Sequence, residues 1–202
     1  MSDWWNKGTD IPLEDKTFRE IINFYLFNCP SEIRQRKGKK SHFNKVSNRG
    51  VTLSEKGWIN GYVSTLTSCM KKGASNKLVY NRFNTSYNIA EETKNIEKTS
   101  TLADKHFEMI TISEHSNMNI PNSIFYYIRN AFAHGSFSVI TADNTKIYYL
   151  ESSKNGVVKA QMRLRQETFL KWIKDFTLSP TELRKILRAE RKQNNKKKRK
   201  AA

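Results

Sequence analysis

The sequence predicts a mostly α-helical bundle with a small β-hairpin or meander inserted in its C-terminal half. Apolar side chains recur at helical spacing in most segments, which is the main signal of amphipathic helices. The period changes only between residues 137 and 164, where short β-rich runs alternate with turn signals. The length of 202 residues suits one domain. We expect a helical domain over residues 1–183, with its core at about 84–176, and a basic tail over 184–202 that lacks regular structure.

The first half of the chain is expected to be helical, apart from its loops. Pro30 ends the first amphipathic stretch, and Ser54 is the expected N-cap of the second. A run rich in Lys and Arg and the polar segment after it are expected to be loops. The expected helices are residues 18–26, 54–70, 86–98 and 101–114, and the expected loops are 34–40, 41–53 and 71–77.

The second half begins with a helix at residues 123–134, followed by Gly135, a residue common just after helix ends. β-Branched and aromatic residues then alternate with polar ones around two turn signals, Ala142-Asp143-Asn144 and Asn155-Gly156. Strands are therefore expected at residues 137–139, 146–150 and 157–164, and helices at 167–176 and 181–191.

Positive charge is the strongest compositional feature. The formal net charge is +17, and residues 184–200 contribute ten Lys or Arg against one Glu, so the remaining chain is also basic, at +8. Such a field concentrates polyanions near the surface, and phosphate contacts then release counterions. Nucleic acid is the expected partner, and Lys196, Lys197, Lys198 and Arg199 are candidate RNA contacts. The alternative is a protein that is merely basic.

The compartment follows from what the sequence lacks. No apolar run reaches the roughly 18 residues of a transmembrane helix, so no membrane association is expected. The N-terminus does not have the pattern of a signal peptide. Cys29 and Cys69 stand alone, without metal-ligand or disulfide spacing, and are expected to be buried reduced thiols. These features indicate a cytoplasmic protein.

The helix at residues 123–134 has two distinct faces. One is an apolar stripe that would pack against the core. A surface stripe normally carries Glu, Lys and Gln, but the second stripe here combines an aromatic hydroxyl, a guanidinium, an amide, a methyl group and an imidazole. The apolar stripe is Ile124, Phe125, Ile128, Ala131 and Phe132; the second is Tyr126, Arg129, Asn130, Ala133 and His134.

The second stripe suits metal-free cleavage of RNA, whose ribose 2′-hydroxyl is a built-in nucleophile. His134 can exchange protons near neutral pH. Arg129 stays cationic and can hold two phosphate oxygens. Asn130 can orient the imidazole or the substrate, and Tyr126 is a candidate RNA contact. One such helix supplies only one histidine, so two facing copies would supply an acid and a base, and a homodimer is expected.

At these residues the chain resembles the HEPN superfamily, whose active members share an Arg-x4–6-His motif, often with a polar residue after the Arg. The segment from Arg129-Asn130 to His134 matches this motif. The resemblance covers roughly residues 84–176, most clearly 119–174. Within the superfamily, the chain is similar to a plasmid- and prophage-borne subgroup. The resemblance implies a helical bundle and a dimeric endoribonuclease that uses no metal or cofactor, with Arg129, Asn130 and His134 as catalytic residues.

The resemblance also implies a biological setting, often that of a toxin or antiphage effector, with an antitoxin or regulatory protein as a possible partner. HEPN toxins paired with a nucleotidyltransferase antitoxin often have Tyr two residues after the His. This chain has Ser136 there, so modification by such a partner is not indicated.

Other interpretations stay open. His134 is also compatible with a simple cation at a helix end, and Arg129 with an ordinary surface charge. A non-catalytic HEPN-type module would use the same face to bind RNA or a protein, and a DNA-binding regulator would use the basic tail. No Gly-rich phosphate loop is present. His42, His106 and His115 have no metal-ligand spacing and are expected to be surface or internally bonded histidines.

Overall fold

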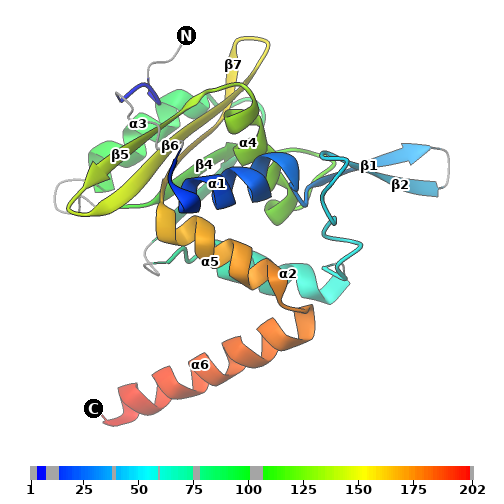
Figure 1. Ribbon diagram of the computed structural model, residues 1–202, viewed down its shortest axis with the longest axis vertical. Coiled ribbons are helices and arrows are strands. Elements are labelled where there is room, and N and C mark those ends of the chain that lie inside the picture. The colour runs from blue at the N-terminus through cyan, green and yellow to red at the C-terminus, as the bar shows by residue number, and fades with distance from the viewer. Residues whose placement is uncertain are drawn as a thin grey trace.

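The computed structural model describes residues 4–7, 14–37, 40–58, 60–74, 78–100 and 107–200. Its centre is a five-stranded mixed sheet with helices on both faces (Figure 1). The predicted mostly helical bundle is therefore wrong, and the fold is α/β. The strands, in sheet order, are β3 (Val79–Phe83), β4 (Met109–Ser113), β7 (Val157–Arg165), β6 (Thr145–Lys154) and β5 (Phe137–Ala142).

Two missed strands account for most of the error in fold class. β4 lies where a helix over residues 101–114 was predicted, although residues 101–106 are outside the described part. Every residue of β4 is buried, so it lacks the polar alternation that identifies a half-exposed strand. Its β-branched run, Ile110-Thr111-Ile112, favours a strand over a helix. β3 pairs with β4 in parallel and was not predicted.

The predicted meander is confirmed as β5, β6 and β7, which pair antiparallel in sequence order. Its two turns lie at the predicted signals. Asp143 and Asn144 have φ of 48° and 62°, and Asn155 and Gly156 have 52° and 75°. Positive φ at both central residues gives each turn a twist that matches the two strands it joins.

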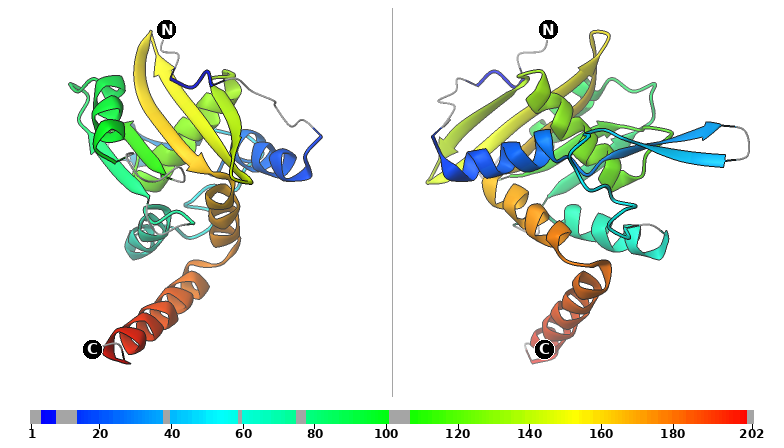
Figure 2. Two further views of the ribbon diagram at one scale, coloured as in Figure 1. Left: turned by 90° about the vertical axis from the view of Figure 1, so that its left-hand side faces the viewer. Right: turned by 45° about the vertical axis from the view of Figure 1, so that its right-hand side comes forward.

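The sheet separates two apolar cores, because alternate residues of each strand point to opposite faces. Tyr148 and Leu150 of β6 pack in the larger core, with α1 (Lys16–Ile22), the π-helical turn η1 (Asn23–Phe27) and α4 (Ile120–Ala133). Ile147 and Tyr149 pack in the smaller core, on the side of α3 (Ile89–Ser100). Figure 2 shows α3 on one side of the sheet and α1 with α4 on the other.

The remaining helices lie below the sheet in Figure 1 and differ from the prediction at their ends. The helix expected from Ser54 begins only at the 3₁₀ turn η2 (Asn60–Tyr62) and continues as α2 (Val63–Met70). Gly57, with φ of 79°, takes a left-handed conformation that a helix excludes. The helices α5 (Gln166–Thr177) and α3 agree with the predicted segments within a few residues.

The last helix, α6 (Pro180–Lys200), runs past the predicted end near Arg191 and through most of the segment expected to lack regular structure. Lys, Arg, Glu and Gln are good helix formers, which accounts for the continuation. The helix leaves the body of the molecule and carries the C-terminal basic residues away from the sheet (Figure 1).

The predicted basic loop is instead a two-stranded ribbon, formed by β1 (Glu32–Lys37) and β2 (Lys40–Lys45), which protrudes from the body (Figure 1). Its base is bonded to the start of α4. The Arg34 N–H donates to the carbonyl oxygen of Asn117 at 3.1 Å, and the Ser31 hydroxyl donates to that of Asn122 at 2.8 Å.

α4 begins three residues earlier than predicted, with a side-chain cap at Asn119. The Asn119 Oδ1 atom accepts from the Asn122 N–H at 3.0 Å. Replacing Asn119 with alanine is expected to lower the free energy of unfolding by about 1 kcal/mol, because one N–H of the first turn loses its partner. Urea denaturation measures this loss. Asn119→Ser keeps an accepting oxygen and should lose much less, so equal losses in both variants would contradict the capping role.

Both cysteines are buried, as predicted. Burial raises the pKa of the Cys29 thiol to about 12 and that of Cys69 to about 11. Among the described residues, neither forms a disulfide.

The raised thiol pKa values predict that stability falls as the pH rises above about 9. The ordinary pKa of a thiol is 9.0, so the unfolded state loses its thiol protons while the folded state retains them. Each thiol then costs about 1.4 kcal/mol of unfolding free energy per pH unit until its folded pKa is reached. Urea denaturation between about pH 8 and 9.5 measures the slope; nearer pH 10 the buried tyrosines with raised pKa values, which ionise there only when unfolded, add a further loss. Cys29→Ala should make the slope shallower, because one of the two thiols no longer contributes, and an unchanged slope would contradict the prediction.

Candidate functional site

The two predicted faces of α4 are present. All five residues of the apolar stripe are buried in the larger core. On the other stripe, Tyr126, Arg129 and Asn130 are half-buried, and Ala133 and His134 are exposed. The polar groups of the motif thus lie at the surface on a helix that the core holds rigidly.

His134 is the C-cap of α4, and Gly135 follows with φ of 64°. The Ser136 N–H donates to the Ala131 carbonyl at 2.9 Å and the Gly135 N–H to the Phe132 carbonyl at 3.2 Å, which is the Schellman pattern. Gly135 adopts the left-handed conformation without strain, so the chain turns sharply away after His134. The imidazole therefore stands at the open end of the helix.

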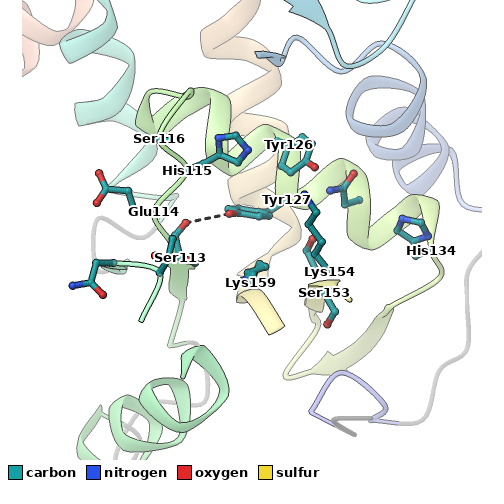
Figure 3. A pocket seen from close by; sticks show the side chains of 14 residues that line it. Ser113, Glu114, His115, Ser116, Tyr126, Tyr127, His134, Ser153, Lys154 and Lys159 are labelled. Atoms are coloured by element: carbon teal, nitrogen blue, oxygen red, sulfur yellow. Dashed lines mark hydrogen bonds between the residues drawn. The ribbon is translucent and has the colours of Figure 1, made fainter. Parts of the chain in front are cut away.

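A pocket of about 840 Å³ lies beside α4, at one edge of the sheet. β3, β4 and β6 run in one direction, so their carboxyl ends meet at this edge, where β7 begins. Polar residues at these ends face the second stripe of α4 across the pocket (Figure 3). The lining residues are Asn84 and Thr85 after β3, Ser113 to Ser116 at the end of β4, Ser152 to Lys154 on β6, Lys159 on β7, and Tyr126, Tyr127, Asn130 and His134.

One wall of the pocket is fixed by a hydrogen bond between α4 and β4. The buried Tyr127 hydroxyl donates to the Ser113 carbonyl oxygen at 3.1 Å (Figure 3). Burial raises the pKa of Tyr127 to about 12, so the hydroxyl remains a donor at neutral pH. This bond ties the helix that carries His134 to the strand that precedes His115.

A β-bulge accounts for Lys159 in the lining. Ser152 pairs with Ala160 and Ser153 with Val158, so Lys159 has no partner across the ladder. Ala160 packs in the larger core, on the side of α4, and strict alternation would send Lys159 to the opposite face. The bulge changes the local direction of the strand, as bulges beside functional sites commonly do, and Lys159 lines the pocket.

The charges of the pocket favour an anion. Lys154 and Lys159 line it, and the one acidic lining residue, Glu114, forms an ion pair at 2.7 Å with Arg82. No ion pair is formed by either lysine among the described residues. Two cations facing a helix that ends in a histidine give a site suited to a phosphate group.

The structure also places His115 in the lining of the pocket, although its spacing in the sequence indicates no functional role. The His115 ring lies 5.8 Å from the Tyr126 ring, centroid to centroid, at 66°. Its Nδ1 atom accepts from the Asn117 N–H at 3.3 Å. A strand at residues 109–113, had it been predicted, would have placed Glu114-His115-Ser116 at its carboxyl end, where sites of α/β proteins gather.

Arg129 does not line the pocket. It lies on the side of α4 near Cys29, where its charge lowers the pKa of the Cys29 thiol against the larger, opposite effect of burial. That thiol donates to the Phe125 carbonyl oxygen at 3.6 Å. One guanidinium N–H donates to the Asn130 Oδ1 atom at 3.4 Å, while the buried Nε has no hydrogen-bond partner in the described part of the chain. Arg129 therefore borders the pocket through Asn130.

The predicted RNA contacts divide into two groups. Tyr126, with Asn130 and His134, lines the pocket. Lys196, Lys197, Lys198 and Arg199 lie in α6, and their side chains are outside the described part.

No protein-family model, curated protein or solved structure matches this chain. Among the described residues, no cluster of three or more His, Cys, Asp or Glu has the arrangement of a metal site. No helix there is long and apolar enough to cross a membrane.

Proposed function

We propose that the protein is a metal-independent endoribonuclease that works in the pocket beside α4. The observation that carries the proposal is that one pocket combines His134 and Asn130 with Lys154 and Lys159. These are a proton-exchanging group, an orienting amide and cations for a phosphate, which RNA cleavage by its own 2′-hydroxyl requires.

The reaction follows from these side chains. The ribose 2′-oxygen attacks the adjacent phosphorus as its proton passes to a base, and the bond from phosphorus to the 5′-oxygen breaks as that oxygen takes up a proton. The products are a 2′,3′-cyclic phosphate and a 5′-hydroxyl. His134 serves in one of the proton transfers, and Asn130 orients the imidazole or the phosphate. Lys154 and Lys159 offset the charge that develops on the phosphate oxygens.

Arg129 contributes from the helix side, through its positive charge and its hydrogen bond to Asn130, and not as a lining residue. Its guanidinium is half-buried and has no carboxylate partner among the described residues. Burying a cation without a partner is costly, and an anionic ligand would offset that cost. Its hydrogen bond to Asn130 couples this cation to the lining of the pocket.

The resemblance to the HEPN superfamily gives this proposal less support than the sequence alone suggests. It stays a prediction that rests on the Arg129–His134 motif, because the helical bundle that it implied is replaced by a mixed sheet with helices on both faces. The homodimer, the role as a toxin or antiphage effector, the antitoxin or regulatory partner and the cytoplasmic location stay predictions of the same kind.

A non-catalytic RNA-binding module is the rival function, and the position of Arg129 favours it. Arg129 lies outside the lining, where binding can tolerate an indirect contact more easily than catalysis can. A protein of this kind would bind RNA in the pocket and release it intact.

Incubation of wild-type protein with end-labelled single-stranded RNA in EDTA tests the proposal. We expect defined fragments from RNA and none from DNA of the same sequence, because DNA lacks the 2′-hydroxyl nucleophile. Intact RNA that remains bound would favour the binding module. Equal cleavage of DNA would contradict the proposed chemistry.

A further inference from the structure

The pocket is longer than one catalytic centre requires. Tyr126 and His134 are eight residues apart on α4, and a helix rises about 1.5 Å per residue, so about 12 Å separates them along its axis. Figure 3 shows His115 beside Tyr126, toward one end of the pocket, and His134 at the other end. A stacked nucleic-acid strand advances about 3.4 Å per nucleotide, so the pocket spans more than one nucleotide.

This separation keeps the two histidines from acting on one phosphate. A general acid and a general base must each lie within about 2.6–3.2 Å of atoms of the same phosphodiester. Burial, reinforced by the charge of Lys154, lowers the pKa of His115 below its ordinary value. His115 is therefore a neutral ring at neutral pH, which makes it a poor proton donor and a poor phosphate ligand.

We propose that His115 and Tyr126 form a nucleobase-binding subsite, which holds an RNA nucleotide next to the one cleaved at His134, with Lys154 on the phosphate between them. The proposal rests on the proposed function only in taking RNA as the occupant of the pocket.

The two rings at this end meet edge to face, at 66°, so a base would stack on one ring with the edge of the other beside it. The Tyr126 ring contacts both His115, at 5.8 Å, and Tyr127, at 5.4 Å. Tyr127 is fixed by its bond to Ser113, and the Asn117 N–H holds the Nδ1 atom of His115. Because Nδ1 accepts this bond, the proton of the neutral imidazole is on Nε2, which can donate to a base. Tyr126 remains half-buried, so part of its ring is accessible.

Lys154 suits the phosphate because of its position in the fold. It is the last residue of β6, beside the Asn155-Gly156 turn, and it lines the pocket with its side chain exposed. Its charge acts on His115, which places it near that end of the pocket. A base on the rings would therefore have its phosphate within the reach of a flexible cation.

The test uses binding rather than cleavage, so that its result does not depend on catalysis. The probe is a 2′-fluoro RNA tetranucleotide, which lacks the nucleophile, with an abasic nucleotide introduced at each position in turn. Fluorescence anisotropy should show that one abasic position weakens wild-type binding by about 5–150-fold, the range of one base stacked on an aromatic ring. His115→Ala should weaken binding of the intact probe similarly and be insensitive to that abasic position.

Two further variants sharpen the result. His115→Phe keeps an aromatic ring and should retain most of the affinity, whereas His42→Ala, a matched change on the exposed face of the β1–β2 ribbon, should bind as wild type does. Equal weakening of intact and abasic probes by His115→Ala, or no weakening at all, would overturn the subsite. So would a His115→Ala loss of RNA cleavage that greatly exceeds the loss of binding, since it would assign His115 to the chemistry.

The outcomes separate this proposal from the proposed function. Base-dependent binding through His115 in a protein that cleaves no RNA would support the subsite and reject the nuclease. Cleavage of RNA by wild type, with no base dependence at His115, would support the nuclease and reject the subsite.

Discussion

Replacing His134 with alanine is expected to lower the rate of RNA cleavage by about 10²–10⁴-fold, the usual contribution of one general acid or base. The side chain is exposed at the end of α4, so its removal leaves no cavity in the core. The turn after it is made by backbone bonds of Gly135 and Ser136, which the substitution does not touch. Folding and RNA affinity should therefore stay close to wild type while the rate falls.

Single-turnover cleavage of labelled RNA, measured beside RNA affinity and thermal unfolding, checks this expectation. His42→Ala is the matched control, because it removes an exposed imidazole outside the pocket. A rate within a few-fold of wild type would exclude His134 from the proton transfers. Parallel loss of rate and affinity would indicate that His134 binds RNA without taking part in the chemistry.

Replacing Arg129 with alanine should lower the cleavage efficiency by roughly 10–100-fold, less than the loss of a donor that touches the reacting group, because Arg129 borders the pocket only through Asn130. Two effects contribute. The phosphate loses the field of a nearby cation, and Asn130, which accepts from the guanidinium at 3.4 Å, loses the group that helps to orient it. Arg129→Lys keeps the charge but not the planar fork, so its cleavage efficiency should lie between those of wild type and Arg129→Ala.

Stability distinguishes this functional role from a structural one. The buried Nε of Arg129 has no hydrogen-bond partner and its guanidinium no ion pair in the described part of the chain, so the folded protein holds a partly desolvated cation. Arg129→Ala should therefore unfold at the wild-type urea concentration or above it. The exposed Arg19→Ala is the control for activity and stability. A large loss of stability in Arg129→Ala alone would contradict the proposed role.

The parts of the fold that could be predicted are those with a local signal. The β5–β7 meander follows from alternation and two turn signals, and α4 from an apolar stripe that ends at Gly135. β4 could not be identified by periodicity, because a strand buried on both faces has no polar alternation. The β1–β2 ribbon has few apolar residues, so composition alone favoured a loop.

The lining of the candidate pocket could be predicted to the extent that one helix supplies it. Tyr126, Asn130 and His134 share a face of α4 and line one pocket, as their helical spacing indicated. The other side of the pocket depends on tertiary structure. Lys159 enters through a bulge, and His115 lies at the carboxyl end of β4, a strand for which the sequence pattern predicts a helix. Helical spacing places Arg129 and Asn130 on the same face of α4, but in the structure only Asn130 lines the pocket.

The chemical identity of the cleavage ends tests the central claim most directly. Wild-type protein would be incubated with a synthetic single-stranded RNA in EDTA, and the fragments analysed by mass spectrometry before and after acid, which opens a cyclic phosphate. Attack by the 2′-hydroxyl predicts 2′,3′-cyclic phosphate and 5′-hydroxyl ends, absent with His134→Ala. Fragments with 5′-phosphate ends, or ends that persist unchanged in His134→Ala, would contradict the mechanism and the assignment of the pocket to it.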